Sequence, residues 1–129
     1  MFRRTVLLLA FSAACLALSG PVFAHNGDEV IPGFDKALEA RQPILIHVTA
    51  SWCEVCQAQK PIVARLLAMP EFKAVKKFDV DFDTQKEILA RYRVQMQSTM
   101  IVYKNGKEVD RQTGETDPVA IESLLREAL

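Results

Sequence analysis

The sequence has few of the residues on which metal sites and disulfide-stabilised folds depend. Its 129 residues include three cysteines, two histidines and one tryptophan. Cys53 and Cys56 lie three positions apart, which leaves Cys15, His25 and His47 as further soft ligands. A structural zinc site needs a second pair of ligands, so this scarcity argues against one. A bridge between residues three apart closes too short a loop to stabilise a fold by much, so we also disfavour a purely structural disulfide.

Excess charge of either sign is missing as well. Lys+Arg and Asp+Glu both number 16, and the counts become 14 and 16 when the first 24 residues, with their two arginines, are set aside. A chain with this balance has no basic footprint for nucleic acid and no polybasic patch for a membrane surface. We therefore expect its partners to be proteins. The sequence does not predict an oligomeric state.

Residues 1–24 have the pattern of a secretory signal peptide. Two arginines precede an apolar run, residues 6–18, and a Gly-Pro break and small residues up to Ala24 follow. The run is shorter than the roughly 20 residues of a membrane-spanning helix. A lipid anchor at Cys15 is the alternative. We favour cleavage near Ala24 because the apolar run continues past Cys15.

Cleavage there would leave a mature chain with a single cysteine pair. We expect an irregular N-terminal arm over residues 25–33, which hold Gly and Pro among polar residues, and one domain over residues 34–129, because the chain is too short for two. Exported proteins meet an oxidising compartment in which disulfides persist. The predicted location is therefore periplasmic or extracellular, and a lone close pair there is typical of a working dithiol.

Hydrophobic periodicity predicts helices that alternate with strands. We expect strands at 44–49, 77–82, 99–103 and 108–112, and helices at 34–41, from Cys53 to just before Pro70, at 84–91 and from Pro118 onward. The last two strands are separated by Asn-Gly, the dipeptide that most strongly predicts a hairpin. This order predicts an α/β fold with a central mixed sheet of about four strands and helices on both faces.

Residue spacing also predicts finer features of the helices. Thr84 and Glu87 have the spacing of a capping box, and Asp117 is expected to cap the last helix. Pro61 removes a backbone hydrogen bond inside the long helix and is expected to bend it. The apolar positions expected to face the core are Ala58, Ile62, Leu66 and Met69 in the long helix and Val119, Ile121, Leu124, Leu125 and Leu129 in the last.

The two cysteines form the candidate functional site. They follow a buried strand and open a helix, at the edge where open α/β sheets place their sites. Unpaired N–H groups and the positive end of the helix dipole would favour a thiolate at Cys53, which we expect to be exposed. Cys56, one turn further on, is close enough to form a disulfide with Cys53 and to release it from a mixed disulfide.

A set of residues spread over nearly all of the mature chain follows one pattern: Ala50 to Cys56, Pro61, Tyr92-Arg93-Val94, Thr99, Lys104-Asn105-Gly106 and Gly114. Together they resemble the thioredoxin family. The arm and residues 34–38 are more similar to exported members, including the C-terminal domain of the membrane thiol:disulfide interchange reductase. The resemblance implies a nucleophilic Cys53, a resolving Cys56, protein disulfide substrates, a membrane electron donor and no cofactor.

The chain departs from the family pattern between the cysteines. Many thioredoxins have Gly-Pro there, and this chain has Glu54-Val55. A carboxylate beside the thiol opposes thiolate formation, which makes a pair less oxidising. The alternative is that Glu54 points to solvent and only complements the helix dipole. We therefore expect a reductase with a potential nearer to about −270 mV than to about −120 mV.

Two further departures concern the residues around the pair. His47 stands where thioredoxins bury an acid, and it is either a general base for Cys56 or a core histidine bonded to a backbone carbonyl. Gln97, Ser98 and Thr99 occupy the loop in which the family has a cis-proline before the Thr. Because a cis bond without proline costs about 3–4 kcal/mol, the Gln97–Ser98 peptide is expected to be trans or strained.

The resemblance implies that this loop and Trp52 contact substrate, and Ser98 is a candidate donor to a cysteine sulfur. Trp52 could equally belong to the core. A second hypothesis treats the protein as a metal-binding or redox-inert adaptor that uses the two cysteines as ligands. Met96 or Met100 would then lie nearby.

Overall fold

The computed structural model describes residues 30–129, so the interpretation of residues 1–24 as a signal peptide and most of the predicted arm lie outside the described part of the chain. The elements are helices α1 (Phe34–Glu39), α2 (Glu54–Leu67), α3 (Lys86–Arg91) and α4 (Pro118–Glu127), the short 3-10 helix η1 (Pro70–Phe72), and strands β1 (Ile44–Thr49), β2 (Lys76–Asp81), β3 (Thr99–Lys104) and β4 (Lys107–Thr113). Within residues 30–129 no helix has the length and apolar character needed to cross a bilayer.

The four strands form one mixed sheet in the order β2-β1-β3-β4. The β1 strand pairs in parallel with β2 and antiparallel with β3, and β3 pairs antiparallel with β4. The predicted α/β class, the strand count and the mixed sheet are therefore confirmed. The central strand β1 is buried along nearly its whole length, as its continuous apolar sequence predicts.

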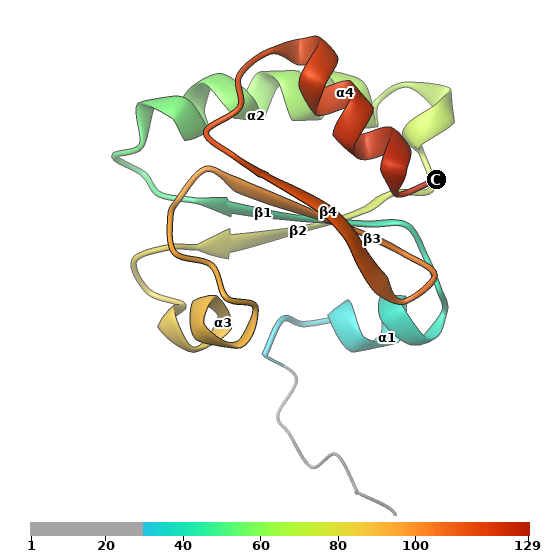
Figure 1. The fold of residues 1–129 in the computed structure, drawn as a ribbon, viewed down its shortest axis with the longest axis horizontal. Helices are drawn as coiled ribbons and strands as arrows, with labels where there is room; N and C mark the ends of the chain where they lie inside the picture. Colours follow the sequence, from blue (N-terminus) through green and yellow to red (C-terminus); the bar gives the residue numbers. More distant parts are fainter. Residues whose placement is uncertain (1–29) are drawn as a thin grey trace, which may run out of the picture.

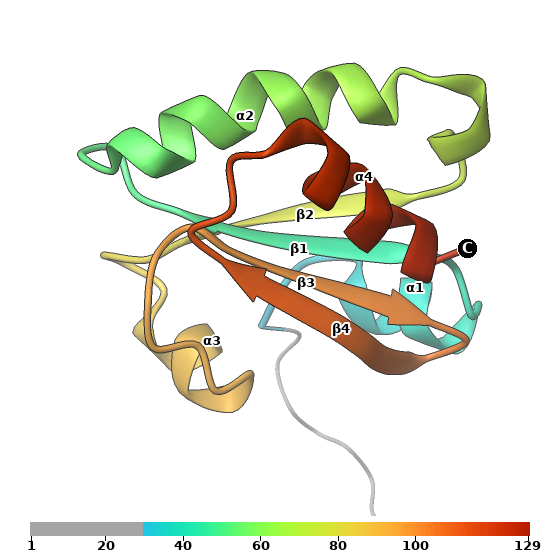
Figure 2. The ribbon, with the colours of Figure 1, turned by 45° about the horizontal axis from the view of Figure 1, so that its top comes forward.

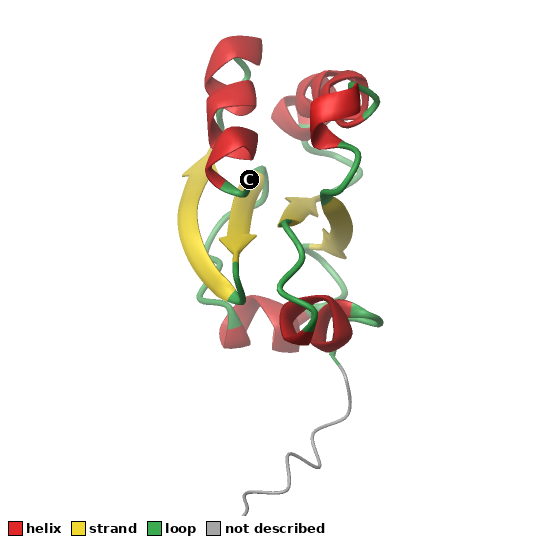
Figure 3. Ribbon diagram, turned by 90° about the vertical axis from the view of Figure 1, so that its right-hand side faces the viewer, coloured by secondary structure: helices red, strands yellow, loops and turns green. Residues whose placement is uncertain are grey.

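Helices cover both faces of the sheet, with α2 and α4 on one side and α1 and α3 on the other (Figures 1 and 3). Alternate residues of β1 point to opposite faces, so each face has its own core. Ile44 and Ile46 pack with Phe34 of α1 and Ile88 of α3. Leu45 packs with the inward faces of α2 and α4.

Local sequence explains the hairpin and the start of α4. Asn105 and Gly106 both have positive φ, 52° and 80°, the combination that a two-residue type I′ turn requires. The side chain of Asp117 accepts a hydrogen bond from the N–H of Val119, and Pro118 occupies the first helical position. Both predictions are confirmed.

Three finer predictions are wrong at least in part, although Leu66 on α2 and Ile121, Leu124 and Leu125 on α4 are buried as expected. The inward face of α2 consists of Cys56, Gln59, Val63 and Leu66, so Ala58 is exposed and Ile62 and Met69 are only partly buried. The α3 helix begins later, at Lys86, and Thr84 donates to Asp81 instead of capping the helix. Val119 on α4 and Leu129, which follows the end of α4, are exposed.

Four connecting segments meet at the edge of the sheet where β1 ends. They are residues 50–53 before α2, 82–85 before α3, 92–98 before β3 and 114–117 before α4. Figure 2 shows them gathered at one end of the sheet, opposite the β3–β4 turn. The topology thus brings the two cysteines next to three loops that are distant in sequence.

Candidate functional site

Cys53 and Cys56 form a disulfide at the start of α2, with their Cα atoms 5.3 Å apart. Cys53 is the N-cap residue and has an extended backbone, with φ −84° and ψ 107°. Its Sγ accepts a hydrogen bond from the backbone N–H of Cys56 at 3.1 Å. A helix N-terminus with an N–H directed at the sulfur stabilises negative charge on that atom, so Cys53 is the sulfur better placed to become a thiolate on reduction.

Both cysteines are buried in the disulfide form, and the expectation of an exposed Cys53 is therefore wrong. Cys53 is 3% exposed and Cys56 is fully buried. Ala50 and Phe82 pack against the pair. The exposed side chain next to the disulfide belongs to a neighbouring residue instead.

That side chain is Trp52, which is 58% exposed. Its indole Nε1 donates to Oδ2 of Asp83 at 2.8 Å, and this bond ties it to the loop before α3. The loop itself is ordered by Asp81, whose carboxylate accepts from the N–H groups of Asp83 and Thr84. The bonds from Thr84 hold the pKa of Asp81 below its ordinary value. The indole is therefore a fixed apolar surface beside the disulfide and not part of the core.

His47 is fully buried beneath α2, where its Nε2 lies 3.0 Å from Oε1 of Gln59. The amide of Gln59 has only one orientation that satisfies its partners, because its Nε2 donates to the carbonyls of Ser98, at 3.1 Å, and Glu115, at 2.9 Å. Its Oε1 must then accept, so His47 donates from Nε2 and is the neutral Nε2–H tautomer. The Nδ1 atom of His47 has no hydrogen-bond partner among the described residues.

Burial lowers the pKa of His47 below its ordinary value of 6.5, and the hydrogen bond to Gln59 opposes this only in part. The imidazole is therefore neutral at neutral pH. Its one unprotonated nitrogen is Nδ1. The expectation of a bond to a backbone carbonyl is wrong, since the partner of His47 is a side chain one helical turn from Cys56.

Ser98 adopts the left-handed conformation, with φ 60°, and residues 30–129 contain no cis peptide bond. The Gln97–Ser98 peptide is therefore trans, which confirms the first of the two expectations. The Ser98 hydroxyl donates to the carbonyl of Gln97 and not to a cysteine sulfur, so that expectation is wrong. The Ser98 carbonyl accepts from Gln59 and from the N–H of Gly114, each at 3.1 Å.

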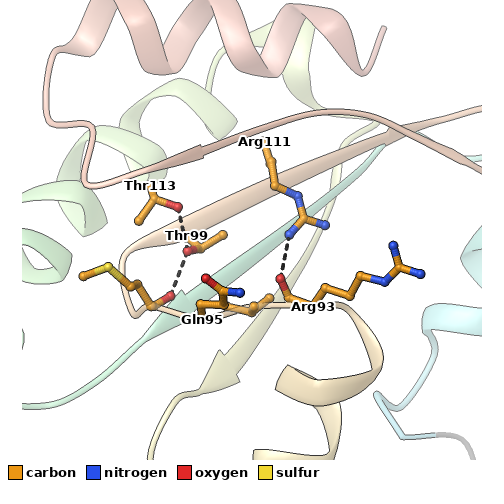
Figure 4. A pocket seen from close by; sticks show the side chains of 7 residues that line it. Arg93, Gln95, Thr99, Arg111 and Thr113 are labelled. Atoms are coloured by element: carbon orange, nitrogen blue, oxygen red, sulfur yellow. Dashed lines mark hydrogen bonds between the residues drawn. The ribbon is translucent and has the colours of Figure 1, made fainter.

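Thr99 is buried beside a surface pocket of about 280 Å³ (Figure 4). Its hydroxyl donates to the Met96 carbonyl at 2.8 Å and lies 2.9 Å from the hydroxyl of Thr113. On the other side of the pocket, the guanidinium of Arg111 donates to the carbonyls of Tyr92 and Arg93. The polar groups lining this pocket therefore hold the 92–98 segment in place.

The structure thus brings all seven candidate residues to one edge of the sheet or directly beneath it. Sequence reasoning missed Gln59 and Asp83, the two side chains that link this edge together. The spacing of Asp83 from Trp52 gave no signal, but Gln59 lies one turn after Cys56 and could have been found as a polar residue on the inward face. The described residues contain no group of three or more His, Cys, Asp or Glu side chains that could hold a metal ion.

Comparisons with known proteins point in one direction. The thioredoxin family model matches residues 25–127. Thioredoxin H-type 1 from Nicotiana tabacum is 31% identical over 122 residues, which cover 93% of this chain and 94% of that protein. A thioredoxin H-type from Oryza sativa subsp. indica is 35% identical over 99 residues, covering 76% and 80%. The crystal structure of Trxlp from Edwardsiella tarda has a TM-score of 0.71 at 43% identity, covering 72% of this chain and 90% of that one.

Proposed function

The chain belongs to the thioredoxin family and is a thiol:disulfide oxidoreductase, and we propose that it works outside the cytoplasm as a reductase of protein disulfides. The observation that carries this proposal is the sulfur of Cys53. It caps α2 and accepts the N–H of Cys56. Trp52 presents an exposed apolar surface next to it.

The proposed reaction begins with the reduced pair. The Cys53 thiolate attacks one sulfur of a substrate disulfide, and a mixed disulfide forms while the other substrate sulfur leaves and takes up a proton. Cys56 then loses its proton and attacks Cys53, which releases the second substrate thiolate. Two electrons pass to the substrate, and the Cys53–Cys56 disulfide forms. Of the two released substrate thiolates, the first takes its proton from water and the second takes up the proton that Cys56 lost. A membrane-bound dithiol donor restores the reduced pair.

His47 is the proposed acceptor of the Cys56 proton. It lies under α2, bonded to Gln59 one helical turn after Cys56, is neutral, and has an Nδ1 that is unprotonated and without a partner among the described residues. His47→Asn should slow release of the mixed disulfide and alter its pH dependence, with the first attack by Cys53 unchanged. A pH profile of resolution identical to that of the wild type would remove His47 from this role.

The direction of electron flow rests on Glu54, which lies in the first turn of α2 and is exposed. A carboxylate there opposes negative charge on Cys53 and so disfavours the strongly oxidising behaviour that comes with a very stable thiolate. Equilibration with glutathione buffers should give a potential nearer to about −270 mV than to about −120 mV. Glu54→Gln is the matched variant, and it should shift the potential upward. A wild-type potential above about −150 mV would contradict the reductase proposal.

Location outside the cytoplasm rests on residues 1–24 alone. Full-length chain produced in a Gram-negative bacterium should be recovered from the periplasm with His25 as its first residue. A chain without residues 2–24 is the control and should stay in the cytoplasm. Recovery of the full-length protein in the cytoplasm with its first residues intact would contradict the proposal.

A further inference from the structure

Gln59 is a buried polar side chain on the otherwise mostly apolar inward face of α2. Burying an amide without partners costs about 1–3 kcal/mol, so a glutamine at such a position has to be satisfied. Its three polar contacts reach β1 through His47, the 92–98 segment through Ser98, and the 114–117 loop through Glu115. One side chain therefore connects the helix of the cysteines to the central strand and to two loops of the site.

The 92–98 segment is held by side chains at several points. Arg111 holds its first residues and Thr99 holds Met96, and both belong to the sheet. Among the side-chain bonds to this segment, the bond from Gln59 to the Ser98 carbonyl is the one that comes from α2. It is therefore the polar contact that sets the segment's position relative to the disulfide.

Solvent reaches Gln97 near the end of the segment but hardly reaches Ser98, which is only 4% exposed. Within the described part of the chain, the N–H groups of Gln97 and Ser98 donate to no other group. Gln97 is partly exposed, and Met96 beside it is 55% exposed. An extended polypeptide can accept from such a free N–H and bury its side chains against the adjacent apolar surface.

We propose that Gln59 is a positioning residue for the exchange reaction, because it holds the main chain of Gln97 and Ser98 in place beside the disulfide for an extended polypeptide substrate. The inference rests on the proposed function and explains how the protein would favour polypeptide disulfides over small ones. A loop fixed in advance lowers the entropy cost of docking a flexible chain. A small disulfide that reaches Cys53 without touching the loop gains nothing from it.

The experiment compares two disulfides in single-turnover reactions of the pre-reduced protein. One is a peptide of about a dozen residues closed by an internal disulfide, and the other is hydroxyethyl disulfide. The fluorescence of Trp52, the only tryptophan, reports oxidation of the neighbouring pair. Gln59→Met keeps the size of the side chain and removes the amide, and Gln59→Asn keeps the amide but is one methylene too short to reach both carbonyls. Arg65→Met, at an exposed position of the same helix, is the control.

Gln59→Met should raise the half-saturating peptide concentration about tenfold, as expected for the loss of one or two neutral hydrogen bonds. The limiting rate with the peptide and the rate with hydroxyethyl disulfide should each change less than about twofold. The equilibrium constant for reduction of the pair, which sets its reduction potential, should also change less than about twofold. Gln59→Asn should give the same pattern with a smaller effect, and it serves as the test if Gln59→Met does not fold. Arg65→Met should match the wild type.

If a folded variant lost reactivity equally toward the peptide and toward hydroxyethyl disulfide, Gln59 would have a structural role only, and the inference would be overturned. So would an unchanged half-saturating peptide concentration. A wild-type protein that reacts with hydroxyethyl disulfide but not with the peptide would instead overturn the proposed function itself, and the inference with it.

Discussion

Replacing Ser98 by proline restores the residue that the family pattern has at this position, and the structure predicts that it will destabilise the protein. Ser98 has φ 60°, whereas the proline ring holds φ near −65°. The backbone would have to rotate by about 125°, which redirects the Ser98 carbonyl. That carbonyl now accepts from Gln59 and Gly114.

The size of the effect follows from those two bonds. Loss of the first leaves an N–H of the buried Gln59 amide without that partner, at about 1–3 kcal/mol. Loss of the second costs about 0.5–1.5 kcal/mol, because Gly114 is exposed and water can replace the bond, so Ser98→Pro should lower the free energy of unfolding by about 1.5–4.5 kcal/mol. Ser98→Gly should behave in the opposite way, because glycine adopts positive φ without the steric cost of about 1–2 kcal/mol that other residues bear. Ser98→Ala keeps that cost and loses the same hydroxyl as Ser98→Gly.

Urea unfolding of the oxidised proteins measures these differences. The Ser98→Gly variant should be more stable than the Ser98→Ala variant by about 1 kcal/mol, and the Ser98→Pro variant should be the least stable of the three. Ser98→Ala is the control for loss of the hydroxyl bond to Gln97. A proline variant as stable as the wild type would refute the argument that Gln59 and Gly114 fix the Ser98 carbonyl in its present direction.

Three further predictions concern stability and dynamics at the site. Because burial depresses the pKa of His47 below 6.5, the native state binds fewer protons than the unfolded chain. The free energy of unfolding should therefore fall as the pH drops from about 7 toward the folded pKa, by at most about 1.4 kcal/mol per pH unit. His47→Gln should remove this part of the slope, and parallel wild-type and variant curves would contradict it. Asp83→Ala should lower the fluorescence anisotropy of Trp52, whereas Asp83→Asn, which still accepts from the indole, should preserve it. Arg111→Met should release the Tyr92 and Arg93 carbonyls and speed amide exchange in the 92–98 segment, and unchanged exchange would exclude this anchoring role.

Local patterns predicted the sheet well because its determinants lie close together in sequence. The continuous apolar run of β1 gave its bounds, residues 44–49, and Asn105-Gly106 gave the hairpin with its two positive φ values. The cap at Asp117 was predictable for the same reason, since donor and acceptor are two residues apart. Each of these features is decided within a few residues, so no knowledge of the fold was needed.

The inward face of α2 could not be read from hydrophobicity because a polar residue occupies it. Gln59 can be buried because Ser98 and Glu115 satisfy its amide. These partners are 39 and 56 residues away in the sequence, so no local pattern reveals them. Periodicity instead favoured Ala58 and Ile62, and the predicted stripe was rotated away from the sheet. The partner of Trp52 was missed for a similar reason, because Asp83 reaches it from a different loop. The cysteine pair was predictable as a site, but the groups that position it come together only in the folded chain.

The central claim is that the sulfur of Cys53 attacks and that of Cys56 resolves, and trapping the mixed disulfide tests it most directly. Reduced Cys56→Ser and Cys53→Ser proteins would be mixed with the disulfide-containing peptide, quenched with acid and weighed by mass spectrometry. We expect Cys56→Ser to accumulate a covalent complex through Cys53, and Cys53→Ser, whose remaining sulfur is fully buried in the oxidised fold, to form little or none. Equal complexes from both variants, or a complex from Cys53→Ser alone, would contradict the assignment.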